Sequence, residues 1–312
     1  MNSTQQWQNV TWFEADEHQA GQRIDNFLFS RLKGVPKSRI YRLIREGQVR
    51  VNKKRIKAET KLAIGDQIRV APIRYEQKDE TAAPVSDKVA QSLLSRVIYE
   101  DEGLMVVNKP SGIAVHGGSG VAYGLIEGLR AATGKKYLEL IHRIDRDTSG
   151  LVMISKKRST LKTLQDLLRE HKIQKTYAAI VKGQVSLDQQ LIDQPLLRYE
   201  LANGERRVRV SKEGKESKTQ WKVAERFMHA TLVYASPLSG RTHQIRVHGL
   251  SIGHPLVGDD KYGHETEYKG PKPRRLCLHA MRLEIPGYAP IEAPLPEDMQ
   301  SLVAQLRAQK KD

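Results

Sequence analysis

Hydrophobic positions recur with a helical period in two short stretches near the N-terminus. They are Ile24, Phe27, Leu28 and Leu32 in RIDNFLFSRL, and Ile40, Leu43 and Ile44 in KSRIYRLIREG. Ser38 is a candidate N-cap of the second helix and Gly47 a candidate end. The stretches QVRVNKKRIK and GDQIRV that follow have the composition of short strands around a turn. The pattern predicts a small α+β module.

Residues 76–95 lose this periodicity and gain proline, alanine and charges of both signs, which is typical of a linker. Beyond them, TLKTLQDLLREHK is amphipathic and predicts a helix. KTYAAIVKG, TQWKVAERF, HATLVYASP and LCLHAMRLEI predict strands. We therefore expect an N-terminal extension over residues 1–21, the small module over 22–75, a linker over 76–95 and a mixed α/β domain over 96–312.

The charge of the chain is concentrated in the small module. The whole chain has 52 Lys or Arg and 36 Asp or Glu, a formal net charge of +16. Residues 22–75 alone contain 15 Lys or Arg and 4 Asp or Glu. Such a concentration attracts a polyanion. We favour nucleic acid over a membrane surface, because basic membrane helices carry a broad aromatic or leucine face. A basic domain with a purely structural role stays open.

Composition narrows the class further. No run approaches the roughly 18 apolar residues of a membrane span, and the polar N-terminus lacks a signal pattern. The single cysteine, Cys277, excludes internal disulfides and a cysteine-based zinc site. His243, His248, His254 and His279 occur without an HExxH motif. We expect a soluble cytoplasmic protein without a metal, whose histidines are structural or contact RNA.

The stretch NKPSGIAVHGGSG has enough glycines for a phosphate-binding loop. It lacks the GxxxxGK[ST] spacing, however, and no dinucleotide fingerprint follows a strand. A strand-turn-strand element is the better interpretation. The sequence therefore predicts no nucleotide cofactor.

Two arginines accompany a predicted helix in SGRTHQIRVHGLSIGHP, residues 239–255. Gly253 and Pro255 are stop signals, so we expect a helix over residues 243–252, with a strand as the alternative. Arg241 at its start and Arg246 one turn later could hold a carboxylate through paired hydrogen bonds. The alternative is that both are plain surface charges.

The stretch HRIDRDTSG, residues 142–150, places Asp145 between Arg143 and Arg146. Taken alone, it favours a charged turn stabilised by its own side chains. Taken with the arginines of residues 239–255, the basic module and the missing cofactor signatures, it is a candidate active-site loop.

These motifs together resemble a known family. HRIDRDTSG is similar to the HRLDxxTSG signature of RluA-type pseudouridine synthases, with Ile144 in place of the usual leucine, and KTYAAIVKG and GRTHQIRVH with GHPLVGDDKYG resemble its two later motifs. RIDNFL, SRIYRLIREGQVRVN and GDQIRV resemble the S4 RNA-binding fold over residues 22–71. The resemblance implies an α+β chain: a small S4-like RNA-binding domain, then a catalytic domain with a mixed, mainly antiparallel sheet and an RNA-binding cleft.

The resemblance also implies roles for particular residues. Asp145 would act at the ribose C1′, either as a nucleophile or by assisting formation of a glycal. Arg246 would pair with Asp145 and keep it ionised and aimed. Tyr177 would pack on the flipped base and is a candidate acceptor of the C5 proton. Expected RNA contacts are Arg143, which would fill the space of the flipped base, Arg146, Thr148, Ser149, Lys175, Arg241, Thr242 and His243, with Lys37, Arg39, Arg42 and Arg45 in the S4-like domain.

The function implied is isomerisation of specific uridines to pseudouridine in 23S ribosomal RNA or in large-subunit assembly intermediates. NGERRVRVSKEGKESKTQW most resembles the branch of the family that acts on large-subunit RNA. The reaction would proceed by base flipping, without a cofactor or a membrane, in a cytoplasmic monomer. A non-catalytic RNA-binding or ribosome-assembly protein is the rival. A third alternative, an S4-bearing synthetase, would need a nucleotide-binding signature, which is missing.

Overall fold

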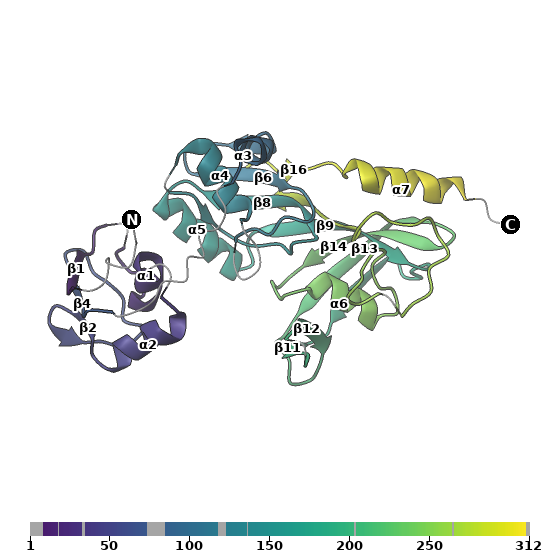
Figure 1. Ribbon diagram of the computed structural model, residues 1–312. Coiled ribbons are helices and arrows are strands. Elements are labelled where there is room, and N and C mark those ends of the chain that lie inside the picture. The colour runs from purple at the N-terminus through teal and green to yellow at the C-terminus, as the bar shows by residue number, and fades with distance from the viewer. Residues whose placement is uncertain are drawn as a thin grey trace. The chain divides into compact units, whose positions relative to one another are not determined.

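The computed structural model of the chain consists of two compact units, residues 1–84 and 85–312. The elements of each can be followed in Figure 1. The structure describes residues 9–17, 19–32, 35–73, 85–117, 123–135, 137–202, 204–263 and 265–309.

In the N-terminal unit, two helices pack against a sheet that has four antiparallel strands within the described residues, in the order β1-β4-β2-β3. All seven apolar residues at the predicted helical spacing are buried in its core. Burial of this apolar face stabilises both helices. The elements are β1 (Thr11–Glu14), α1 (Ile24–Arg31), α2 (Lys37–Arg45), β2 (Val49–Val51), β3 (Lys54–Arg55) and β4 (Gln67–Val70).

Three details of this unit differ from the sequence-based expectation. Helix α2 begins at Lys37 with Pro36 as its N-cap, so the prediction of Ser38 as the cap is wrong. Gly47 follows the C-cap residue and has φ of +72°, the left-handed conformation in which glycine commonly ends a helix. Residues 11–14, expected within an extension, form a strand of the sheet. Residues 1–8 lie outside the described part of the chain.

The predicted linker over residues 76–95 is wrong for its second half. Asp87–Leu94 form helix α3, in which Ala90 and Leu93 are buried. Leu93 packs against Gly128, where a Cβ would lie 2.4 Å from the leucine side chain. Val89 and Leu94 also pack against this core, so the apolar positions of α3 do follow a helical period. The helix has only eight residues and continues a segment rich in proline, serine and charge, which is why its sequence resembles a linker. Residues 74–84 lie outside the described residues.

The C-terminal unit is built on a mixed sheet, which has ten strands within the residues that the structure describes. Its main order is β10-β13-β14-β9-β15-β8-β6-β5, with β16 beside β15 and β7 beside β8. The β15–β8 pair is parallel, and the other pairs are antiparallel. Strands β11 and β12 form a separate hairpin.

The strands of this unit are β5 (Val97–Glu100), β6 (Leu104–Lys109), β7 (Glu139–Leu140), β8 (Ser149–Ser155), β9 (Gln174–Lys182), β10 (Gln189–Asp193), β11 (Leu196–Glu200), β12 (Arg206–Val210), β13 (Lys218–Arg226), β14 (Ala230–Pro237), β15 (Leu278–Glu284) and β16 (Ile291–Glu292). Besides α3, its helices are α4 (Leu125–Thr133), α5 (Arg158–Arg169), α6 (Gln244–Ser251) and α7 (Glu297–Ala308). The predicted strands correspond to β9, β13, β14 and β15, and the predicted amphipathic helix is α5.

Strand β8 is buried on both faces, so it reads as a continuous apolar run. Val152 and Ile154 pack in the cluster that includes α4, whereas Leu151 and Met153 pack in the cluster that includes α5. Neighbouring strand residues point to opposite faces, so the two helices cover opposite sides of β8. Packing on both faces holds β8 in position, and with it Ser149, the residue at which the preceding loop enters the strand.

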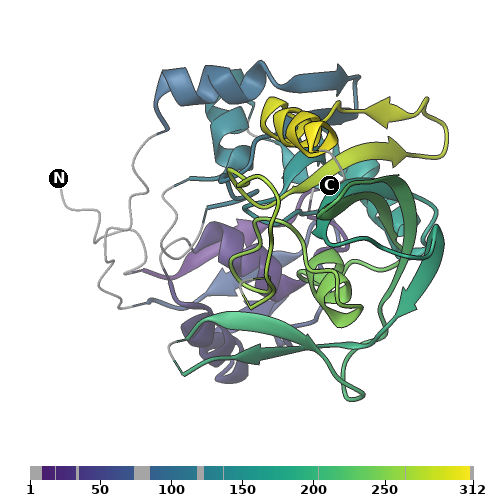
Figure 2. The ribbon, with the colours of Figure 1, turned by 90° about the vertical axis from the view of Figure 1, so that its right-hand side faces the viewer.

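Helix α6 lies inside the curve formed by β13 and β14, as Figure 2 shows. Its bounds confirm the helix predicted over residues 243–252, and the strand alternative is wrong. The NKPSG stretch was expected to form a strand, a turn and a second strand. Residues 108 and 109 end β6, and residues 110–117 form turns and irregular backbone in place of a second strand. Residues 118–120 of the stretch lie outside the described residues.

Candidate active site

Asp145 lies in the loop that leads from β7 into β8, and the end of this loop is fixed by a glycine. Ser149 and Gly150 already pair with β15. Gly150 has φ of +112°, and a Cβ there would lie 2.2 Å from the carbonyl oxygen of Ala280. Any other residue would push the two strands apart. The side chain of Asp145 is 22% exposed, so it is open to a substrate but partly shielded from water.

A buried lysine ties the Asp145 loop to the end of β6. Lys109 has no exposed surface, and its ammonium group donates to the carbonyl oxygens of Pro110 at 2.8 Å, Ile113 at 2.7 Å and Arg146 at 3.0 Å. Burial lowers the pKa of Lys109 to about 7, although two nearby carboxylates oppose that shift. One donor therefore satisfies carbonyl groups from two loops, which places Asp145 relative to the sheet.

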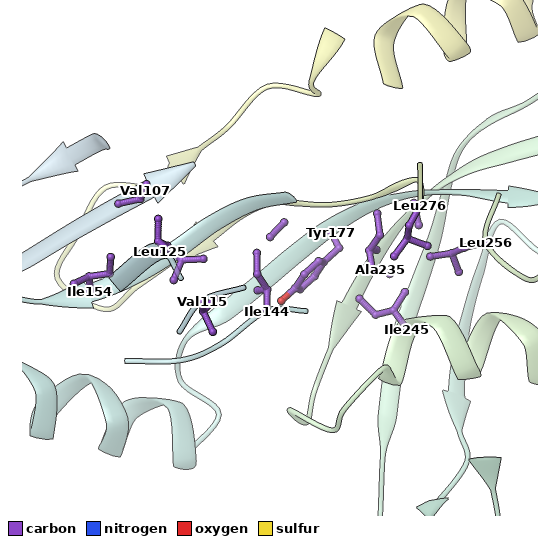
Figure 3. Close-up of a cluster of buried hydrophobic side chains, with 14 of the residues drawn as sticks. Val107, Val115, Leu125, Ile144, Ile154, Tyr177, Ala235, Ile245, Leu256 and Leu276 are labelled. Atoms are coloured by element: carbon purple, nitrogen blue, oxygen red, sulfur yellow. The ribbon is translucent and has the colours of Figure 1, made fainter. Parts of the chain in front are cut away.

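Tyr177 extends from the middle of β9 toward the Asp145 loop. Its neighbours across the sheet are Ala235 on β14 and Ala280 on β15, whose small side chains leave room for the ring. The ring is buried, and its hydroxyl points toward Ile144 (Figure 3). Burial, and then the charge of Asp145, raise the pKa of Tyr177 well above its usual value, so the phenol keeps its proton at neutral pH.

Arg246, on α6, has a partner that the sequence did not reveal. Its Nε and Nη2 groups donate to the two carboxylate oxygens of Asp259 at 2.8 Å and 2.7 Å. Both side chains are buried. Burial alone would lower the pKa of Arg246, but its bonds to Asp259 and the charges of Asp259 and Asp145 raise it. The expected direct pair between Arg246 and Asp145 is therefore corrected: the paired hydrogen bonds go to Asp259.

His243 is the nearest basic group to Asp145 within the described residues. It precedes α6 in the left-handed conformation, with φ of +53° and ψ of +21°. Its Nε2 lies 3.9 Å from Oδ2 of Asp145, and its Nδ1 lies 2.7 Å from the Tyr262 hydroxyl. Burial lowers the pKa of His243 in spite of the charge of Asp145. The imidazole is therefore neutral at neutral pH.

A single pocket brings most of the predicted site residues together. The candidate catalytic residues Asp145, Tyr177 and Arg246 line it, and so do six of the expected RNA contacts: Arg143, Thr148, Lys175, Arg241, Thr242 and His243. Arg143 and Arg241 are exposed at the surface, whereas burial lowers the pKa of Lys175. The pocket thus has one carboxylate in its lining and cations around it, an arrangement suited to an anionic strand.

Two predicted contacts, Arg146 and Ser149, do not line this pocket. Ser149 is buried, and its hydroxyl lies 2.9 Å from Nδ1 of His279. The expectation that Ser149 contacts RNA is contradicted, because its side chain belongs to the interior of the sheet. Arg146 is exposed, but its Nε donates to the carbonyl oxygen of Gly112 at 2.9 Å, which braces the loop.

The four cations expected on the S4-like domain lie on α2. Lys37, Arg42 and Arg45 are exposed, and Arg39 is half-buried. Arg42 donates to Glu46 one turn later at 2.6 Å, so its charge is partly neutralised within the helix. Three of the four therefore remain as the stronger candidates for contacts with phosphate.

Sequence reasoning missed several residues that position the site. Asp259 and Tyr262 were within the quoted GDDKYG stretch, but nothing in the spacing pointed to their partners. Gln244 was also missed. Its oxygen accepts from Ser239 at 2.8 Å and from the Arg241 N–H at 3.0 Å, which fixes the loop before α6. Lys109 could have been noticed as a single cation at the end of the apolar run LMVVNK, but that position alone does not predict its partners.

Within the described residues, no group of three or more His, Cys, Asp or Glu side chains could hold a metal ion. In that same part of the chain, no helix has both the length and the apolar character needed to cross a bilayer.

Comparison with known proteins gives two matches to sequence families. Residues 103–251 match the family described as RNA pseudouridylate synthase, and residues 22–68 match the S4 domain. The S4-like domain predicted over residues 22–71 is thereby confirmed, and the HRIDRDTSG, KTYAAIVKG and GRTHQIRVH motifs lie within the other match.

Named relatives and solved structures agree with these matches. The chain is 52% identical over 303 residues to ribosomal large subunit pseudouridine synthase C of Yersinia pestis, covering 94% of each. It is 51% identical over 305 residues to the protein of that name from Escherichia coli K12, covering 94% of this chain and 95% of the relative. The structure of human RNA pseudouridylate synthase domain containing 4 shares the fold, with a TM-score of 0.60 and 24% identity over 72% of this chain and 98% of that one.

Proposed function

The chain belongs to the family of RNA pseudouridylate synthases, which isomerise uridine to pseudouridine in RNA, and we propose that its substrate is 23S ribosomal RNA. Support comes from relatives named for the large ribosomal subunit that are half identical over nearly the whole chain. Either free RNA or a large-subunit assembly intermediate would fit. Because ribosomes are assembled in the cytoplasm of such bacteria, we place the protein there, acting as a monomer.

The reaction breaks the bond between C1′ and N1, forms a bond between C1′ and C5, and moves the C5 proton to solvent while N1 gains one. The atoms of substrate and product are the same, so the net reaction needs no oxidant, reductant or group donor. The target base must first leave the stack, which costs a few kcal/mol unless it is already unpaired. A cation-rimmed pocket at the surface is where such a base would enter.

The observation that carries the catalytic assignment is that Asp145 is the sole carboxylate among the described residues lining this pocket. A carboxylate can promote departure of uracil by attack on C1′, or by taking a ribose proton to give a glycal. Both routes place the same group next to the sugar. Arg246 supports this carboxylate by its positive charge, with Asp259 holding the guanidinium in place.

Tyr177 supplies the surface on which the detached uracil turns. Stacking of a base on an aromatic ring contributes about 1–3 kcal/mol. Because the pKa of Tyr177 is raised, the phenol can take the C5 proton only if its own proton leaves in the same step. Tyr177→Phe separates these roles: retained turnover would limit Tyr177 to packing, whereas lost turnover with RNA affinity unchanged would support proton transfer.

The remaining predicted residues contact the RNA in this proposal. Arg143 occupies the space left by the flipped base, and Lys175, Arg241 and Thr242 contact the strand beside it. Arg146 holds the loop through Gly112 and contacts phosphate, whereas Thr148 is buried and only lines the pocket beside Asp145. The cations of α2, Lys37, Arg39, Arg42 and Arg45, add affinity by releasing counterions from structured RNA.

The experiment that tests this function is pseudouridine mapping of ribosomal RNA by carbodiimide modification in a strain that lacks the gene. We expect specific large-subunit positions to be unmodified, restored by the wild-type gene and not by Asp145→Asn. Modification that persists in cells with only the Asp145→Asn protein would show that another residue is the catalyst. Rescue of a ribosome-assembly defect by the inactive variant would favour a non-catalytic role.

A further inference from the structure

His243 is a non-glycine residue in the left-handed backbone conformation; its carbonyl oxygen accepts the first hydrogen bond of α6, from the Val247 N–H at 3.0 Å, but its side chain does not cap the helix. A non-glycine residue in the left-handed region costs free energy and often marks a functional position. His243 occupies the N-cap of α6, but its side chain makes no capping hydrogen bond. Its ring instead reaches between Tyr262 and Asp145. The backbone conformation thus directs the ring into the pocket rather than toward the helix.

The hydrogen bonds around Tyr262 decide which nitrogen of His243 carries the proton. The Val208 N–H donates to the Tyr262 hydroxyl oxygen at 3.0 Å. The hydroxyl's own hydrogen is then free to point at Nδ1 of His243, 2.7 Å away. Burial raises the pKa of Tyr262 to about 12, so this hydroxyl stays protonated. A neutral imidazole that accepts at Nδ1 has its hydrogen on Nε2, the nitrogen facing Asp145.

Two negative and two positive groups face the imidazole, and they shift its pKa in opposite directions. They are Asp145 from the β7–β8 loop, Arg246 from α6, and Asp259 and Lys261 from the segment after α6. Burial is the largest influence and favours the neutral ring. His243 therefore presents an N–H donor without adding a charge that would neutralise the carboxylate.

Asp145 needs such a donor because Arg246 is otherwise engaged. The Nε and Nη2 groups of Arg246 are bonded to Asp259, and His243 is the sole basic side chain at ion-pair distance from Asp145 among the described residues. The separation of 3.9 Å is longer than a hydrogen bond. Such contacts in a free enzyme commonly shorten when the substrate binds.

We propose that His243 is a positioning residue: its Nε2–H, set by Tyr262, holds Oδ2 of Asp145 and directs the other carboxylate oxygen at the ribose. This inference rests on the proposed role of Asp145 as the catalyst. The observation behind it is the chain of contacts from Val208 through Tyr262 and His243 to Asp145.

Three substitutions of His243 separate positioning from backbone geometry. The amide nitrogen of glutamine can take the place of Nε2, whereas that of asparagine can reach only the place of Nδ1. Asparagine, however, tolerates the left-handed conformation and is a favourable N-cap. We expect His243→Ala and His243→Asn to lower the single-turnover rate about 10²-fold at saturating RNA. His243→Gln should recover most of that rate, and RNA affinity should change little in all three.

Tyr262→Phe keeps the ring but removes the hydroxyl that selects the tautomer. Loss of that donor makes the neutral imidazole less favourable, so the pKa of His243 rises. We expect a slower single turnover and an acid limb of the rate profile that moves to higher pH. This variant keeps the test open if a His243 variant fails to fold.

The opposite ranking, with His243→Asn as active as wild type and His243→Gln no better than His243→Ala, would overturn the proposal. So would a Tyr262→Phe profile that superimposes on the wild-type one. Asp145→Asn, measured alongside, separates the failure of the proposed function from the failure of the His243 proposal. If Asp145→Asn stays active, the assignment of Asp145 as the catalyst fails, whatever the His243 variants show.

Discussion

In the N-terminal unit Arg42 pairs with Glu46 at the surface, where the arginine side chain is 58% exposed. In the C-terminal unit Arg246 pairs with Asp259 in the interior, where the two side chains are 3% and 0% exposed. Exposed pairs contribute about 0–1 kcal/mol, but removal of one partner from a buried pair costs about 3–5 kcal/mol. The exposed pair of the N-terminal unit therefore adds little to stability, whereas the buried pair of the C-terminal unit fixes the geometry of a pocket.

We therefore expect the two units to differ in their tolerance of substitution. Cations of α2 can act on RNA through water and at a distance, so none needs an exact place. In the proposed reaction the carboxylate of Asp145 lies against one atom of a sugar, and Lys109 and Gly150 fix the loop that carries it. Affinity is spread over a surface, whereas chemistry depends on a few buried contacts.

The largest effect should come from breaking the buried pair. Asp259→Asn keeps the shape but leaves Arg246 buried without its counter-charge. We expect a loss of about 3–5 kcal/mol in the free energy of unfolding and a large fall in turnover. Urea denaturation measures the first and single-turnover kinetics the second. The double variant Arg42→Ala/Glu46→Ala is the control, with a change within about 0.5 kcal/mol. Equal effects in the two variants would remove the distinction between the units.

A smaller effect is expected from acid. His279 is fully buried, and burial lowers its pKa from 6.5 to about 4. Between those values the unfolded chain binds a proton that the folded chain does not, so the stability falls as pH drops from 6.5 to about 4 and the effect is complete below that. His279→Gln, whose amide can still donate to Ala293, should have a pH profile flatter by about 3–4 kcal/mol. Parallel profiles for the two proteins in denaturation at several pH values would contradict this.

The smallest effect on stability, and the clearest on affinity, should come from α2. Lys37→Ala, Arg39→Ala and Arg45→Ala together should leave stability within about 1 kcal/mol, because Lys37 and Arg45 are exposed and Arg39 is only half-buried. The RNA dissociation constant should rise, and the dependence of log affinity on log salt should become shallower by about 2–3. Turnover of the bound complex should not change. An unaltered salt slope would mean that α2 does not contact phosphate, and Arg42→Ala/Glu46→Ala is the charge-neutral control.

The sequence predicts the elements well where one face is apolar, as in α2 and α5, because the apolar residues recur with the period of a helix. It missed α3, an eight-residue helix whose core-facing residues Val89, Ala90, Leu93 and Leu94 follow directly on a segment rich in proline and charge. The motif residues of the pocket could be predicted by resemblance, and the structure brings nine of them together. Ser149 was expected to contact RNA as part of the matched motif, but its pairing with β15 places its side chain in the interior of the sheet, against His279.

Partners across the sequence could not be predicted. Arg246 could hold either Asp145 or Asp259, and only the path of the segment after α6 decides between them. The same holds for Lys109, whose three acceptors are carbonyl groups that no sequence motif specifies. Every residue has a backbone carbonyl group, so the residue type does not show which carbonyl oxygen will accept a hydrogen bond.

The central claim is that Asp145 performs the chemistry in a pocket to which the rest of the protein delivers RNA. Its most direct measurement is the single-turnover rate of pseudouridine formation in large-subunit RNA by purified Asp145→Asn, with the RNA affinity measured on the same protein. We expect a rate below about one-thousandth of wild type and an affinity within about threefold. A rate within about tenfold of wild type would contradict the claim.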